Sequence, residues 1–201
     1  MKTRLFAMAA SSALVVLIAA CGAPHASSPV STGAPATSSS AGSIANVSDS
    51  DVSFAQQMIP HHQQAVEMAD LALTRETSPE VKKLAEQIKA AQGPEIEMMS
   101  MWLQSWGAPM EMGEDHSGHD MGGMDMSGMM SDDDMQALAD AQGAEFDRMW
   151  LEMMIAHHQG AISMAEQVKA ASSNADVTSL AGAVMTGQAE EIDTMQKLLA
   201  Q

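Results

Sequence analysis

The chain repeats itself, and this repeat constrains the possible fold more than any other feature of the sequence. Residues 58–69 align with residues 154–165 at a constant offset of 96, and eight of the twelve aligned pairs are identical. The same offset aligns further residues without a gap as far as Leu103 and Leu199. The chain therefore contains a duplicated unit of about fifty residues, and both copies are expected to fold in the same way.

Each copy is predicted to form a pair of helices. Apolar residues recur at three- and four-residue spacing from Phe54 onwards, as one face of a helix requires. Ser78 can cap a second helix that has Pro79 at its first position, and Asn174 replaces Ser78 in the second copy. This second helix should end at Gly107. Because a helical hairpin cannot bury its apolar face alone, the two hairpins predict an all-α, antiparallel four-helix bundle.

The N-terminal part of the chain indicates export. Residues 1–20 combine Lys2 and Arg4 with an apolar run, which is typical of a secretory signal peptide. The only cysteine, Cys21, follows directly, and this junction resembles the lipobox of bacterial lipoproteins. Residues 21–47 are rich in Ser, Ala, Pro, Thr and Gly, which predicts a flexible linker. We expect a protein anchored to the membrane by a lipid on Cys21, either on the outer face of the cell membrane or in a periplasm. Plain secretion is the alternative.

The remaining residues, 48–201, are expected to form the duplicated bundle. The first hairpin covers residues 51–107, a Met- and His-rich linker covers 108–131, and the second hairpin covers 132–201. A short helix from Asp132 should lead into the second copy, because Ser131 can cap it.

Charge and cysteine content exclude several classes of protein. The chain has 26 acidic and 9 basic residues, a formal net charge of −17. Nucleic-acid binding is therefore not expected, since Lys and Arg must neutralise the phosphates. A single cysteine excludes an intrachain disulfide and a Cys-x-x-Cys centre.

Two pairs of adjacent histidines form the first candidate metal site. On a helix, Met58 lies one turn before His61 and His62, so the three side chains can converge on the bundle interior. The equivalent residues of the second copy are Met154, His157 and His158. Imidazole and thioether ligands together suit a soft or borderline metal ion.

Four polar residues on the apolar face of the second helices offer a different interpretation of these histidines. They are Gln92, Glu95, Gln188 and Glu191. Buried polar groups cost about 1–3 kcal/mol each unless they are hydrogen-bonded. A His–Glu hydrogen bond across each hairpin would satisfy both groups and fix the helix register. Since buried polar groups usually have protein partners, this structural interpretation is preferred for the core histidines.

The linker between the copies is the second candidate metal site. Residues 110–130 combine seven Met and two His with five acidic residues and five Gly, a composition that argues against a packed helix. Thioethers suit Cu(I), imidazoles suit Cu(II), and acidic residues concentrate cations. The candidate ligands are Met110, Met112, His116, His119, Met121, Met124, Met126, Met129 and Met130. Metal binding is preferred here over an acidic linker without ligands.

The methionines within the predicted helices are expected to be mostly core or rim residues. Met fills irregular gaps with little strain, and this applies to Met149 and Met153 among others. Spacing alone does not identify any that extend a metal-binding surface.

The doubled motif resembles the domain-of-unknown-function 305 family. The resemblance rests on Met-Ile-x-His-His-Gln-x-Ala-x-x-Met-Ala in both copies, on Gln-x-x-Glu-Ile-x-x-Met in both second helices, and on residues 143–147. It covers Asp51 to about Leu199 and implies a secreted or lipid-anchored bundle of ferritin-like type, with copper binding in some members. The family's motif residues fall on Met58, His61, His62, Met68, Met154, His157, His158 and Met164. One departure, Gln64 against Gly160, would give the two sites different widths.

The leading hypothesis is a non-enzymatic, membrane-tethered copper protein that sequesters the ion or passes it to a copper-handling partner. Cu(I) is the preferred ion, and Cu(II) and Ag(I) are further candidates. A di-iron enzyme is disfavoured because such bundles use Glu-x-x-His on two helices, and neither copy contains this motif. A structural or interaction module with hydrogen-bonded core histidines is the remaining alternative.

Overall fold

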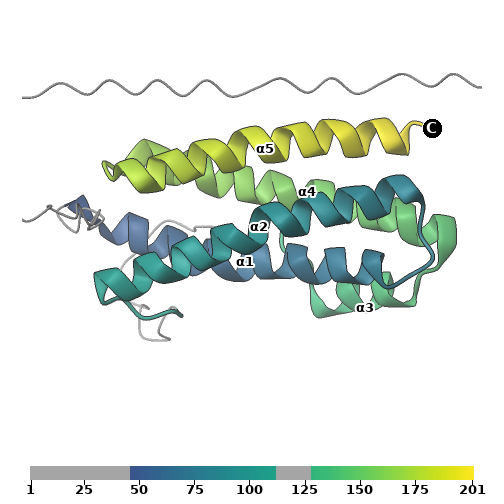
Figure 1. Cartoon of the computed structure of the whole chain (residues 1–201), viewed down its shortest axis with the longest axis horizontal. Helices are drawn as coiled ribbons and strands as arrows, with labels where there is room; N and C mark the ends of the chain where they lie inside the picture. Colours follow the sequence, from purple (N-terminus) through teal and green to yellow (C-terminus); the bar gives the residue numbers. More distant parts are fainter. Residues whose placement is uncertain (1–45, 112–127) are drawn as a thin grey trace, which may run out of the picture. The chain divides into compact units, whose positions relative to one another are not determined.

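The structure is a computed structural model that describes residues 46–111 and 128–201. These residues form five helices and no strand, which confirms the predicted all-α fold (Figure 1). The helices are α1 (Asp49–Leu73), α2 (Pro79–Trp106), α3 (Asp132–Asp140), α4 (Gly143–Ala171) and α5 (Ala175–Leu199). None of them is both long and apolar enough to span a membrane. The predicted signal peptide and Cys21 lie outside the described residues.

The helices end where the sequence offers suitable capping residues. The side chain of Ser78 accepts a hydrogen bond from the backbone N–H of Val81, and Pro79 occupies the first position of α2. Asn174 caps α5 in the same way. Helix α2 ends at Gly107, whose φ of 67° lies in the left-handed region that favours glycine. The predicted helix ends are therefore confirmed at these positions.

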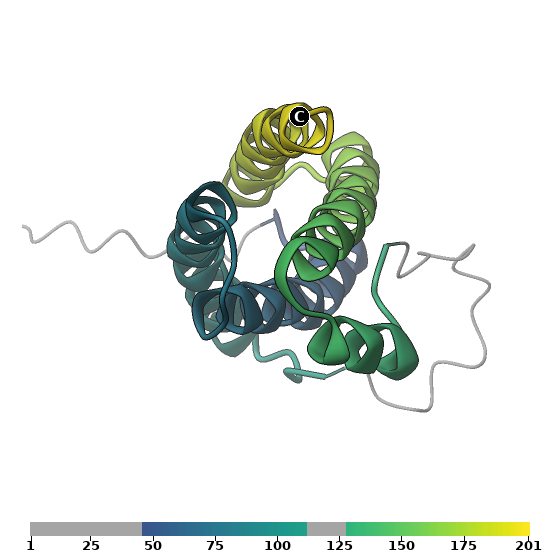
Figure 2. The same cartoon turned by 90° about the vertical axis from the view of Figure 1, so that its right-hand side faces the viewer.

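Helices α1, α2, α4 and α5 form a four-helix bundle, seen end-on in Figure 2. Each copy of the repeat supplies one hairpin, α1 with α2 and α4 with α5. The copies are joined mainly by packing of α1 on α4, whereas α2 and α5 make sparse contacts. Helices α1 and α4 are antiparallel, because Phe54 near the start of α1 packs in one cluster with Val168 near the end of α4.

Two apolar clusters make up the core of the bundle. Cluster A contains Ala65, Met68, Ala69, Ala72, Val81, Leu84, Ala85, Ile88, Leu138, Ala141, Phe146, Trp150, Leu151, Met154 and Met195. Cluster B contains Phe54, Ala55, Met58, Ile59, Met99, Leu103, Ala161, Met164, Ala165, Val168, Val177, Leu180, Ala181 and Val184. Along both α1 and α4, the paired histidines fall between the residues of the two clusters. A polar layer therefore crosses the middle of an otherwise apolar interior.

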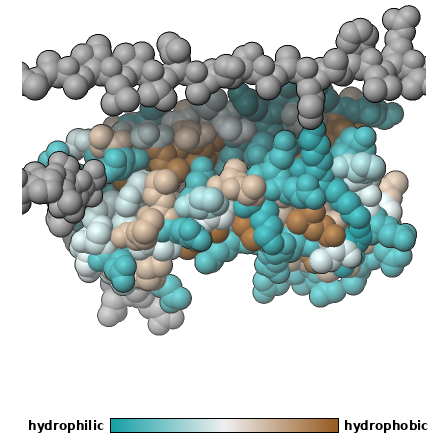
Figure 3. Space-filling view, in the orientation of Figure 1, coloured by the Kyte–Doolittle hydropathy of each residue, from teal (hydrophilic) through white to brown (hydrophobic). Residues whose placement is uncertain are grey.

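The short helix α3 precedes the second copy, and within residues 46–111 the first copy has no comparable helix before it. Its apolar side is anchored by Leu138, which is fully buried in cluster A, and it packs against α4. Figures 1 and 2 show it lying beside the N-terminal half of α4. Figure 3 shows mostly hydrophilic residues over the right-hand part of this face and a mixture of hydrophilic and hydrophobic residues over its left-hand part.

Candidate metal site

The four paired histidines, which we call the histidine layer, are completely buried. His61 of α1 and His157 of α4 meet where the two copies pack together, with ring centroids 3.8 Å apart and planes inclined by 40°. These two residues are equivalent in the repeat, so the copies touch through matching side chains. The predicted convergence of the histidines on the bundle interior is what the structure shows.

The outer histidine of each pair is hydrogen-bonded within its own hairpin. His62 Nε2 lies 2.8 Å from Glu95 Oε2, and His158 Nε2 lies 2.7 Å from Glu191 Oε2. A carboxylate only accepts hydrogen bonds, so Nε2 donates in both pairs, and in a neutral imidazole Nδ1 then carries the free lone pair. Within the described parts of the chain, both Nδ1 atoms are buried without a hydrogen-bond partner. The His–Glu pairing anticipated from the sequence is therefore present, and it leaves one unused acceptor on each ring.

Two buried amides extend this polar interior. Gln92 and Gln188 are 2% and 4% exposed, and each lies three residues before the glutamate of its hairpin. Among the described residues, Nε2 and Oε1 of Gln92 have no hydrogen-bond partner, and neither does Oε1 of Gln188. A buried polar group without a partner costs about 1–3 kcal/mol. Such orphaned donors and acceptors fit a site that receives an ion or another polar ligand.

Burial also fixes the protonation of the central histidine. Burial and then repulsion from His61, His158 and His62 lower the pKa of His157 to about 2. The imidazole of His157 is therefore neutral at physiological pH, which is the state a histidine needs in order to bind a metal ion.

The motif methionines are buried, and the structure groups them across the two copies. Met58 and Met154 are fully buried one turn before His62 and His158. Met58 lies in cluster B together with Met164 of the other copy, and Met154 lies in cluster A together with Met68. Each cluster thus combines the first motif methionine of one copy with the second motif methionine of the other.

Only the two ends of the Met-rich linker fall within the described residues. They include Met110, which is 47% exposed, and the half-buried Met129 and Met130. The remaining predicted linker ligands lie outside the described residues: Met112, His116, His119, Met121, Met124 and Met126.

Both ends of this linker are hydrogen-bonded to α1 by glutamines that sequence reasoning did not single out as anchors. Gln56 Nε2 donates to the carbonyl oxygen of Pro109 (2.8 Å). Gln64 Nε2 donates to the carbonyl oxygen of Met130 (2.8 Å), and the Met130 N–H donates back to Gln64 Oε1 (2.7 Å). Gln64 was expected to alter the width of a metal site, and the structure gives it this anchoring contact.

The described residues hold no group of three or more His, Cys, Asp and Glu side chains that could bind a metal ion by themselves. One surface pocket lies between α2 and α5 and is lined by Glu95, Met98 and Trp102 among others. Glu95, the partner of His62, is therefore accessible from the surface, and its side chain is 20% exposed.

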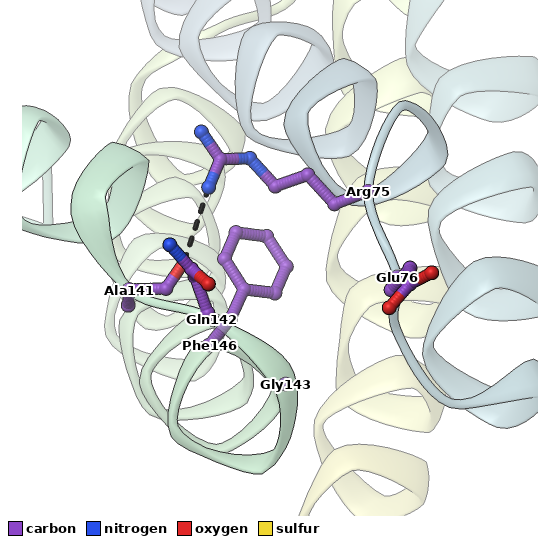
Figure 4. Close-up of a pocket in the computed structure, with 6 residues that line it drawn as sticks. All are labelled: Arg75, Glu76, Ala141, Gln142, Gly143 and Phe146. Atoms are coloured by element: carbon purple, nitrogen blue, oxygen red, sulfur yellow. Dashed lines mark hydrogen bonds between the residues drawn. The ribbon is translucent and has the colours of Figure 1, made fainter.

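A second pocket, at the start of α4, contains none of the candidate ligands (Figure 4). Arg75 Nη1 donates to the carbonyl oxygen of Ala141 (3.1 Å), and the guanidinium lies 5.3 Å from the centroid of the Phe146 ring. These contacts fasten the loop after α1 to the start of α4, which is a structural role.

Comparison with known proteins identifies the family. The profile of a domain of unknown function, DUF305, matches residues 51–199. The chain belongs to the DUF305 family. A search of curated proteins gave no match.

Solved structures of DUF305 proteins share this fold. A DUF305 protein from Streptomyces coelicolor is 33% identical, with a TM-score of 0.67, over 75% of this chain and 91% of its own. A DUF305 fragment from Deinococcus radiodurans is 31% identical, with a TM-score of 0.66, over 77% and 98%. CopM in its Cu(II)-bound form is 37% identical, with a TM-score of 0.62, over 75% and 95%. CopM has also been solved with Cu(I) and with silver bound.

Proposed function

We propose that this DUF305 protein binds copper outside the cytoplasm, tethered to a membrane by a lipid on Cys21. It holds Cu(I) in preference, and Cu(II) or Ag(I) as well. It sequesters the ion or transfers it by ligand exchange to a copper-handling protein, and it catalyses no reaction of its own.

The observation that carries this proposal is the pair His62–Glu95, with its equivalent His158–Glu191. Histidines that bind metals commonly donate their other ring N–H to a carboxylate, which fixes the tautomer and makes the ligand nitrogen more basic. Here the glutamates accept from Nε2 at 2.8 and 2.7 Å. The Nδ1 atoms are buried and unpaired among the described residues, so each can serve as the metal-binding nitrogen.

Thioethers one helical turn from these histidines favour copper over a harder ion. Met58 lies one turn before His62 and is fully buried, and Met154 is placed identically before His158. Thioether and imidazole ligands suit Cu(I) better than Mg²⁺ or Ca²⁺, which prefer oxygen. The linker methionines, together with His116 and His119, add a second set of such ligands.

The relatives support the choice of copper as the ion and a location outside the cytoplasm. CopM, 34–37% identical to this chain, has been solved with Cu(I), Cu(II) and silver. The Streptomyces coelicolor relative is named as a secreted protein. Export also agrees with the signal peptide and the cysteine expected from residues 1–21.

A structural module is the second candidate function, and the same pairs favour it. The hydrogen bonds of His62 with Glu95 and of His158 with Glu191 join the helices of each hairpin without a metal. In that case the stability of the protein would not respond to copper.

An anaerobic Cu(I) titration distinguishes the two functions. Residues 22–201, which leave out only the expected signal peptide and lipidated cysteine, compete for Cu(I) with a chromophoric chelator. Two or more tightly held equivalents, with a higher melting temperature, are expected for a copper protein. If the protein takes no Cu(I) from the chelator, the copper function is wrong and the structural module remains.

A further inference from the structure

The two copies of the repeat differ systematically along one stripe of the first helix. On α4, Met149, Met153, Ala156 and Gly160 follow one another at intervals of four, three and four residues, so they share one side of the helix. On α1, the equivalent residues are Ser53, Gln57, Pro60 and Gln64. The second copy thus has two methionines where the first has polar residues, although the core positions of the two copies match.

The chain that precedes the second copy contacts one end of this stripe, at Ala156 and Gly160. Gly128 lies directly on the backbone of α4, since a Cβ atom there would stand 2.4 Å from the carbonyl oxygen of Ala156 and 3.1 Å from the Cα of Gly160. A side chain at position 160 would obstruct this approach. Met130, two residues after Gly128, is held to α1 by two hydrogen bonds with Gln64. The difference between the copies at this position therefore has a structural effect. Gly160 leaves room for Gly128 against α4, and Gln64 holds Met130 to α1.

Helix α3 then runs back along α4 and carries a further methionine that is partly buried. Its fully buried Leu138 anchors it to cluster A, and Met135, one turn earlier, is half-buried against that cluster. Met130, Met149 and Met153 are likewise half-buried and packed against cluster A. Four methionines from three separate segments thus pack, each partly buried, against cluster A.

Packing alone does not explain why sulfur is used at all four positions. Leu has a similar volume and fixes a packed seam better than the flexible Met. A half-buried thioether differs from Leu in one chemical respect, which is that its sulfur is a soft ligand for Cu(I) and Ag(I). None of these four side chains is fully buried, which allows an ion from solution to approach them.

We propose that Met130, Met135, Met149 and Met153 form a thioether site for a soft monovalent ion, Cu(I) or Ag(I), at the seam between α3 and α4. This site is separate from the histidine layer and uses no histidine. It rests on the proposed function only for the choice of ion. The first copy lacks it, so the two halves of the duplicated bundle are not equivalent in metal binding.

The test replaces the four methionines by leucine in the chain of residues 22–201. Met130→Leu, Met135→Leu, Met149→Leu and Met153→Leu together remove the sulfur and retain the volume, so helicity and the metal-free melting temperature should stay close to the wild type. Titration with Ag(I) against a competing chelator should then show at least one equivalent fewer than the wild type. The control variant, Met101→Leu, changes an exposed methionine of α2 and should bind the wild-type number.

A second measurement does not depend on the folding of the variant. In wild-type protein with ¹³C-labelled methionine methyl groups, the resonances of the four methionines should shift together as one equivalent of Ag(I) is added. If the leucine variant binds as many equivalents as the wild type, or the four resonances do not shift, the thioether site is wrong and the proposed function stands. If the wild type binds neither Cu(I) nor Ag(I), the proposed function fails as well.

Discussion

The imidazole rings of His61 and His157 stand 3.8 Å apart inside the bundle, at the contact between the two copies of the repeat. Two positive charges at this distance repel each other strongly, and neither ring is exposed to water. The contact therefore excludes two charged rings, and it makes the stability of the bundle sensitive to acid.

The first prediction concerns this acid sensitivity. His157 has a pKa of about 2 in the folded protein against about 6.5 in the unfolded chain. Between these values the unfolded state binds more protons, so stability is fully present above pH 6.5 and is lost as the pH falls. Between pH 7 and pH 5, the titration of His157 alone should lower the free energy of unfolding by about 2 kcal/mol. Urea denaturation of metal-free protein at both pH values measures this, and His157→Gln should lose less stability over the same range.

The second prediction concerns the carboxylate behind His62. Glu95→Gln retains an oxygen that can accept from Nε2 but removes the negative charge that makes the ring a better ligand. Copper affinity should fall about 10- to 100-fold, with little loss of helicity. Chelator competition measures the affinity. Glu97→Gln, two residues further along α2 and exposed, is the control and should bind like the wild type. Equal affinities for the two variants would remove His62 from the site.

The third prediction separates the linker from the bundle. Replacing residues 112–127 with a Gly/Ser segment of equal length removes six of the predicted ligands. The anchoring residues Pro109 and Met130 are kept, so the hydrogen bonds to Gln56 and Gln64 can still form. Copper stoichiometry should fall while circular dichroism and the melting temperature stay unchanged. An unchanged stoichiometry would exclude the linker as a binding region.

The fourth prediction concerns the seating of the linker on α4. Gly128 has a φ of 86°, and a Cβ there would meet a backbone oxygen at 2.4 Å. Gly128→Ala should therefore destabilise the protein by about 1–3 kcal/mol. Gly187→Ala in α5, where a Cβ would meet nothing within 4 Å, should instead stabilise it by about 0.5–1 kcal/mol. Equilibrium denaturation in urea compares both, and a neutral Gly128→Ala would show that residues 128–130 are not held on α4.

Local signals in the sequence were sufficient to predict the helices and their pairing. Apolar periodicity, Ser78 as a cap and Gly107 as a terminator act within one or two turns, so they are visible without tertiary structure. The His62–Glu95 pair was also predictable, because a histidine and a glutamate on the apolar faces of adjacent helices need hydrogen-bond partners.

Contacts between distant segments were not predictable in the same way. Met58 shares its cluster with Met164 and not with Met68 of its own copy, which depends on how the two hairpins are placed against each other. Hydrogen bonds such as that from Gln64 to Met130 join a side chain to a backbone far away in the sequence and leave no periodic signal. The proposed site of four methionines could not be predicted either, because it depends on how α3 packs against α4.

The glutamines that fasten residues 109 and 130 to α1 have a consequence for how such proteins can diversify. Because the two attachment points belong to the bundle, the stretch between them can grow or shrink with little effect on folding, at about 0.6 kcal/mol for each doubling of its length. Insertions and deletions there would change how many soft ligands the chain carries while the helices stay as they are. Under the proposed copper-binding function, the number of ligands and the thermodynamic stability would then vary independently.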